Sequence, residues 1–133
     1  MLVIDASVLT VALADDGPDG DHARRRIRGE RLVAPELIDL EVTSAFRGHV
    51  RGGVLDRRRA DLAMDDLASM PMRRVSHRPV LPRCWELRDN VTPYDAAYVA
   101  LAEMLQVILL TGDGRLARFI GPRCRIEVIG PHR

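Results

Sequence analysis

The sequence predicts an α/β protein, a three-layer α/β/α sandwich around a central parallel sheet of about five strands. Short strand patterns and longer helix patterns alternate along the whole chain, as in βαβ units. Strand candidates such as 107–110 are apolar at every position, which is typical of strands covered on both faces of a parallel sheet. In such sheets, ligands bind beyond the carboxyl ends of the strands, where the strand order reverses.

Each element has its own local signal. Strands are predicted where short, mostly apolar runs occur: 2–4, 32–34, 72–75, 107–110 and 126–129. Helices are predicted over the longer intervening stretches: 6–14, 21–29, 36–51, 56–69, 80–89 and 93–105. Gly52-Gly53 and Pro71 end two of these helices, and Thr92-Pro93 supplies an N-cap and a first-position proline for the last.

Length and composition predict one soluble domain spanning 1–133. Hydrophobic residues make up 47% of the 133 residues and charged residues 29%, which is ordinary for a globular protein. No apolar run approaches the roughly 20 residues of a membrane span. The start MLVIDAS lacks the basic lead of a secretory signal, so we expect a cytoplasmic protein.

The cations are all arginine. The chain contains no lysine, so its 20 basic residues are arginines, and they nearly balance the 19 acids to give a net charge of +1. In the 21–29 helix, Arg24, Arg25 and Arg28 are candidates to bind a nucleic-acid backbone, because guanidinium groups suit phosphate. A solvated helix face is the alternative. Cys84 and Cys124 are not spaced as zinc ligands.

Three acids occupy positions that have ordinary structural explanations. Asp5 follows the first strand and precedes a helix, where an aspartate can act as an N-cap. Asp113 lies between two glycines after the 107–110 strand, as in many turns. Asp95 is the third residue of a helix capped by Thr92, where its charge favours the helix N-terminus.

Glu41 is the fourth acid, and it is harder to explain structurally. The apolar stripe predicted for its helix consists of Ile38, Val42, Ala45 and His49. Glu41 lies about 60° from the centre of that stripe, so we expect it to be half-buried, while Asp39 faces solvent. A half-buried carboxylate needs a positive partner. That partner is either an arginine from elsewhere in the chain or a bound cation.

The four acids converge in the predicted topology. Asp5 and Asp113 end parallel strands, Asp95 begins the helix that leads into the 107–110 strand, and Glu41 follows the second strand. Carboxylates about 4 Å apart repel by roughly 4 kcal/mol per pair at an effective dielectric of 20. Such a cluster holds either protons or a cation, and oxygen ligands suit Mg²⁺ or Mn²⁺. A bound dication activates water, which fits phosphodiester hydrolysis.

Four segments also resemble a known family. The segments are VIDASVL (3–9), PELIDLEV (35–42), TPYDAAYVALA (92–102) and LLTGDGRLA (109–117). Together they resemble the successive motifs of PIN-domain ribonucleases, specifically the VapC toxins of bacterial toxin-antitoxin pairs. The resemblance spans nearly the whole chain and implies the Rossmann-like PIN fold.

The resemblance also implies a site and partners. It makes Asp5, Glu41, Asp95 and Asp113 the acidic quartet around Mg²⁺, with Ser7 and Thr111 orienting ligands or water. It implies an RNA substrate such as tRNA or rRNA, a cognate VapB-like antitoxin and a toxin homodimer. Some relatives carry a further acid after the fourth motif, where this chain has Gly114, Arg115 and Leu116, so one metal ion or two remains open.

Other classes fit the residues less well. Receiver domains of response regulators and haloacid-dehalogenase-like phosphatases are also small α/β proteins with clustered acids. Both use a lysine, which this chain lacks, and Asp5-Ala6-Ser7 contains no second aspartate. A PIN-like module that binds RNA or protein without catalysis remains the alternative to a nuclease.

Overall fold

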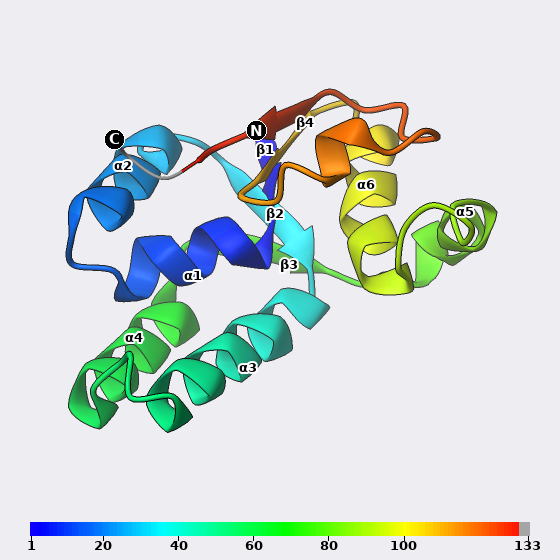
Figure 1. Cartoon of the computed structure of the whole chain (residues 1–133). Coiled ribbons are helices and arrows are strands. Elements are labelled where there is room, and N and C mark those ends of the chain that lie inside the picture. Colours follow the sequence, from blue (N-terminus) through cyan, green and yellow to red (C-terminus); the bar gives the residue numbers. More distant parts are fainter. Residues whose placement is uncertain (131–133) are drawn as a thin grey trace.

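Figure 1 shows the computed structural model, in which residues 1–130 are described. Five parallel strands form one sheet in the order β3-β2-β1-β4-β5. The strands are β1 (Leu2–Ile4), β2 (Leu32–Pro35), β3 (Met72–Val75), β4 (Ile108–Thr111) and β5 (Ile126–Val128). The predicted parallel sheet is therefore confirmed. Residues 131–133 of the predicted single domain lie outside the described part of the chain.

Six α-helices flank the sheet. They are α1 (Ala6–Ala14), α2 (Pro18–Ile27), α3 (Leu37–Arg51), α4 (Arg57–Ser69), α5 (Leu81–Glu86) and α6 (Pro93–Leu105). Helix α1 packs against α2, α3 and α4, whereas α6 lies against β1, β2 and β4 and carries α5 (Figure 1). The three-layer prediction is confirmed. Within residues 1–130, none of the helices has the length and apolarity of a membrane span.

The apolar runs become the central strands. Every residue of β1 and β2 is buried, because helices cover both faces of the sheet there. The edge strands β3 and β5 are partly exposed and carry charged residues, which discourages pairing with another chain. Because β2 and β4 lie on opposite sides of β1, the strand order reverses at β1, and a binding site is expected there.

Two predicted helices differ from the structure by more than one residue at an end. Helix α2 begins at Pro18 rather than 21, because Gly17 serves as the N-cap and Pro18 suits the first helical position. The Asp15 carboxylate accepts from the Gly17 amide at 2.7 Å, which stabilises this start. The predicted 80–89 helix is a 3₁₀ turn (Arg78–Val80) followed by α5, which ends at Glu86. There the chain turns inward to bury Leu87.

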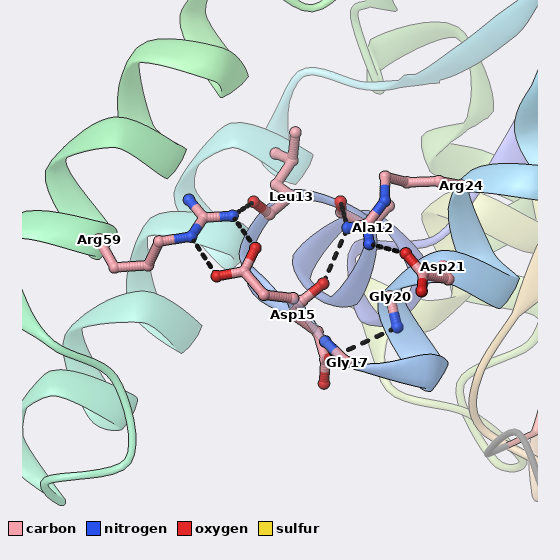
Figure 2. A network of polar contacts seen from close by, with 9 residues as sticks. Ala12, Leu13, Asp15, Gly17, Gly20, Asp21, Arg24 and Arg59 are labelled. Atoms are coloured by element: carbon pink, nitrogen blue, oxygen red, sulfur yellow. Dashed lines mark hydrogen bonds and ion pairs between the residues drawn. The ribbon is translucent and has the colours of Figure 1, made fainter.

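Arginines join the helices on the α1 side of the sheet. The Arg24 guanidinium donates to the carbonyls of Ala12 (2.9 Å) and Asp15 (2.8 Å) at the end of α1, and Arg59 from α4 donates to the Leu13 carbonyl at 2.8 Å (Figure 2). The last carbonyls of a helix lack partners within the helix and attract cations. These two arginines therefore fix α2 and α4 against α1.

Another arginine joins α5, α6 and the loop before β5. Arg83 donates to both carboxylate oxygens of Glu103, at 2.7 and 3.2 Å, and to the Gly121 carbonyl at 2.8 Å. The Arg123 amide also donates to Glu103, at 2.6 Å. Burial opposes ionisation of Glu103, but these donors outweigh it and hold the pKa of Glu103 below its usual value. The ionised carboxylate therefore stabilises the folded state.

We predict that Glu103→Gln lowers the free energy of unfolding by about 1–3 kcal/mol at pH 7, because it weakens a charge-assisted network. Since the folded pKa is depressed, the contribution is present above the unfolded pKa of about 4.3 and is lost as pH falls through the folded value. The difference in free energy of unfolding between wild type and Glu103→Gln, measured by urea unfolding, should therefore decrease from pH 7 to pH 3.

The control for this prediction uses the same arginine. Glu86 also pairs with Arg83, at 3.0 Å, but its side chain is 61% exposed. Glu86→Gln should change stability by less than about 0.5 kcal/mol. Equal effects of the two variants would contradict a special role for the partly buried Glu103.

Candidate active site

Strand register brings Asp5 beside Thr111. Val3 pairs with Leu109 and Ile4 with Leu110, so the next residues of the two strands are neighbours. The Thr111 hydroxyl donates to Asp5 Oδ2 at 2.6 Å, and the Ser7 hydroxyl donates to the same oxygen at 2.9 Å. Asp5 is 7% exposed and its side chain makes no capping bond to α1. The N-cap explanation for its carboxylate is therefore wrong.

Backbone amides orient both hydroxyls. Ser7 Oγ accepts from the Gly112 amide at 2.9 Å, and Thr111 Oγ1 accepts from the Asp113 amide at 3.0 Å. Because an amide occupies an acceptor site on each hydroxyl, the hydroxyl proton is free to face Asp5. The close approach also favours glycine at 112, since a Cβ there would make a tight contact of 3.2 Å with Ser7 Oγ.

Glu41 reaches the site from α3. The buried face of this helix consists of Ile38, Val42 and Phe46. His49, predicted to lie on the apolar stripe, is exposed instead, because burying the large Phe46 ring turns that end of the stripe away from His49. Glu41 is half-buried, as predicted.

The close partner of Glu41 is a phenol rather than the arginine considered from the sequence. The Tyr98 hydroxyl of α6 donates to Glu41 Oε1 at 2.6 Å. Burial raises the pKa of Glu41, the Tyr98 hydrogen bond opposes that shift, and the negative charges of Asp5 and Asp95 add to it. Within residues 1–130, Glu41 is therefore a carboxylate whose charge is not fully compensated.

Asp95 faces the same edge from the first turn of α6. Its amide donates to Thr92 Oγ1 at 3.2 Å, which confirms the predicted cap. Burial raises the pKa of Asp95, and the charges of Asp5 and Asp113 raise it further, against smaller opposing effects of Thr92 and Arg115. The capping bond uses the backbone of Asp95 and leaves its carboxylate facing other acids.

Asp113 has a cation that the sequence analysis did not assign to it. Arg115 donates from Nε to Oδ1 at 3.1 Å and from Nη2 to Oδ2 at 3.0 Å, and its own amide donates to Oδ1 at 2.9 Å. These contacts with Arg115 hold the pKa of Asp113 below its usual value. The spacing of Asp113 and Arg115 in the Gly-rich turn was the available sequence signal.

The four acids thus lie at one edge of the sheet and influence one another electrostatically. Asp5 raises the pKa of both Glu41 and Asp95, and Asp113 raises that of Asp95. Within residues 1–130, no three His, Cys, Asp or Glu side chains are arranged to hold a metal ion directly. The oxygen donors and the uncompensated charge fit a hydrated dication, because Mg²⁺ keeps several waters when one or two carboxylates bind it.

Helix α2 borders this edge. A hollow of about 220 Å³ lies between α2 and the edge, and Ser7, Gly112 and Ala23 are among the residues that line it. Of the arginines predicted to contact RNA, Arg25 is exposed on α2 and Arg28 is exposed directly after its last residue. Arg24 is partly buried and is held by the carbonyls at the end of α1 (Figure 2).

Comparisons with known proteins agree with this architecture. The PIN-domain family matches residues 2–121. Ribonuclease VapC1 of Mycobacterium tuberculosis is 40% identical over 128 residues, which cover 96% of each chain. Ribonuclease VapC12 of the same organism is 40% identical over 129 residues, covering 97% of this chain and 99% of the relative.

A solved structure shows the same fold at low identity. VapBC2 from Rickettsia felis, bound to a DNA fragment of its promoter, superposes with a TM-score of 0.69 at 10% identity and covers 98% of each chain. This likeness concerns the fold, whereas the sequence matches extend through all four acidic positions. The chain therefore belongs to the PIN-domain family and, within it, to the VapC ribonucleases.

Proposed function

We propose that this chain is a Mg²⁺-dependent endoribonuclease that acts as the toxin of a toxin-antitoxin pair. Its substrate is an RNA such as tRNA or rRNA, and a cognate VapB-like antitoxin inhibits it. The observation that supports this most is the acidic edge at the strand-order reversal, where the charge of Asp5 raises the pKa of Glu41 and Asp95, and that of Asp113 raises the pKa of Asp95 further. Membership of the VapC ribonucleases supports the same reaction.

The proposed site divides the work among the four acids. Asp5 and Asp95 would hold the ion directly, and Glu41 and Asp113 would hold it through water. When bound, the ion lowers the pKa of a water and stabilises charge on the phosphate oxygens, as Mg²⁺ or the substitute Mn²⁺ does in nucleases. Ser7 and Thr111 hold Asp5 in one orientation. Glu41, whose pKa is raised by burial, is suited to accept a proton from the attacking water.

We further propose that arginines of α2 bind the RNA backbone. Arg25 is exposed on α2 and Arg28 directly after it, and their charge offsets repulsion between phosphate and the acids. Arg24 is held by the carbonyls at the end of α1 and pairs with Asp21 at 2.6 Å, so we do not include it in this contact. Binding through these residues is expected to weaken as salt increases.

The proposed assembly is a toxin homodimer bound by the antitoxin. Apolar side chains that a monomer leaves in water support an interface, and Leu40 on α3 is 76% exposed. In VapBC2 of Rickettsia felis the related fold occurs in a toxin-antitoxin complex. The expected location is the cytoplasm.

We predict that Asp5→Asn abolishes metal binding and RNA cleavage together. Excess Mg²⁺ should stabilise the wild type by RT ln(1 + [L]/Kd), about 2.7 kcal/mol at 100 times Kd, and the variant should lose this shift because it loses a buried ligand. Cleavage of total tRNA and rRNA should fall by about 100-fold or more. Thermal unfolding with and without Mg²⁺, followed by gel analysis of the RNA, checks both expectations.

The matched control is Asp65→Asn, which removes an exposed acid on α4. It should keep both the Mg²⁺ shift and cleavage. If the wild type binds metal and RNA but does not cleave, the chain is the non-catalytic PIN-like module instead. If cleavage survives Asp5→Asn, the proposed site is wrong.

We also predict that Asp95→Asn stabilises the metal-free protein. In EDTA the free energy of unfolding of the variant should exceed that of wild type by about 1 kcal/mol. The reason is that the variant loses a half-buried charge that faces Asp5 and Asp113. In excess Mg²⁺ the order should reverse, since the wild type gains more from the ion. Chemical denaturation in the two buffers measures this. If the Asp95 charge served only to favour the N-terminus of α6, the variant would be less stable than wild type in both buffers.

A further inference from the structure

We propose that Arg115 binds the RNA phosphate beside the metal, and that it rests on Asp113 only while the site is empty of ion and RNA. This inference rests on the proposed nuclease function. In the metal-free protein the acidic edge needs a positive charge, and the Arg115 guanidinium is placed to provide it. The guanidinium then leaves Asp113 when a metal ion binds.

The contact geometry marks Arg115 as a substitute for a bound cation. Its Nε and Nη2 atoms engage the two carboxylate oxygens of Asp113 at 3.1 and 3.0 Å, so the guanidinium occupies the bidentate face of that acid. A metal-bound water that donates to Asp113 would compete for the same oxygens. Metal loading and the ion pair are therefore mutually opposed.

The ion pair is exposed enough to break. The Arg115 side chain is 73% exposed, compared with 27% for Asp113. Ion pairs between exposed side chains are weak, because solvent screens the attraction, and they shift an equilibrium by no more than about fivefold. By contrast, Arg83 and Arg24 are partly buried and donate to several backbone carbonyls or acids, so they cannot leave without larger losses.

A released Arg115 stays close to the reacting groups. Its charge already acts on Asp95 as well as on Asp113. Asp95 and Asp113 belong to different elements, so the guanidinium lies where the acidic edge opens to solvent. The planar fork that fits a carboxylate also fits a phosphate. With the acids neutralised by a metal ion, the N–H groups of Arg115 can bind an RNA phosphate without any large movement of the chain.

The alternative is a purely local clamp. The Arg115 amide also bonds Asp113, at 2.9 Å, and the Leu116 amide bonds the Asp113 carbonyl at 3.2 Å, so the side-chain ion pair could serve only to stiffen this turn. A clamp and a phosphate ligand predict different results. If Arg115 is only a clamp, its loss disturbs Asp113 and weakens both metal binding and RNA binding. If Arg115 competes with the metal and binds phosphate, its loss strengthens metal binding and weakens RNA binding.

The experiment compares wild type with Arg115→Ala, Arg115→Lys and the remote charge control Arg58→Ala, all as the full chain. Mn²⁺ affinity is measured by calorimetry without RNA. RNA affinity is measured by fluorescence anisotropy on a short labelled single strand of mixed sequence, over a range of salt concentrations. Ca²⁺ replaces Mg²⁺ in the RNA measurements, and a gel verifies that the RNA stays intact.

We expect Arg115→Ala to bind Mn²⁺ about two- to fivefold more tightly, because a competing cation is gone. The same variant should bind RNA about tenfold more weakly and reduce the slope of log K against log salt by about 0.7, the loss of one phosphate contact on a single strand. Arg115→Lys should restore the salt slope, since it keeps the charge. Arg58→Ala should leave Mn²⁺ binding unchanged.

Two results would overturn the inference. One is weaker Mn²⁺ binding in Arg115→Ala, which identifies a clamp. The other is unchanged RNA affinity and salt slope, which shows that Arg115 does not touch phosphate. Either can occur while wild type binds Mn²⁺ and cleaves RNA, so the proposed function would stand. A wild type that binds no Mn²⁺ and cleaves no RNA would instead refute the proposed function itself.

Discussion

The buried carboxylate of Asp5, held by the hydroxyls of Ser7 and Thr111, is the constraint on which the site depends. A carboxylate that is 7% exposed is costly unless donors surround it. Here the donors come from the first turn of α1 and from the end of β4, so the contact requires the β1–β4 register. A shift of that register by one residue would remove Thr111 and turn the neighbouring side chains to the opposite face.

Two further acids of the edge, Glu41 and Asp95, add charge that residues 1–130 do not neutralise. Glu41 has a phenol as its close partner, and Asp95 faces Asp5 and Asp113, so burial and repulsion raise the pKa of both. By contrast, acids elsewhere in the chain, such as Glu103 and Glu127, have arginine partners and lowered pKa values. The chain contains twenty arginines, yet those within residues 1–130 leave Glu41 and Asp95 without a cation that lowers their pKa values to the usual range. That contrast separates a site from an ordinary charged surface.

Local signals in the sequence were sufficient to predict the helices and strands, but they could not predict contacts between residues far apart in the chain. The bounds of α1 and α6 were predicted because short apolar strands and the Thr92-Pro93 cap define them locally. The Tyr98–Glu41 bond joins residues 57 positions apart, and no periodicity encodes it. The role of Arg24 was also hidden, because a run of arginines does not reveal which guanidinium meets the free carbonyls of another helix.

Structural and functional explanations of one residue can hold together when they use different atoms. The amide of Asp95 serves the helix cap through Thr92, while its carboxylate contributes to the acidic edge. The positive end of α6 lies beneath that carboxylate and offsets part of its repulsion. A helix N-terminus therefore lets a third acid approach Asp5 at a lower cost than a strand or loop would allow. The helix N-terminus that explains Asp95 structurally therefore also lowers the electrostatic cost of placing its carboxylate near Asp5.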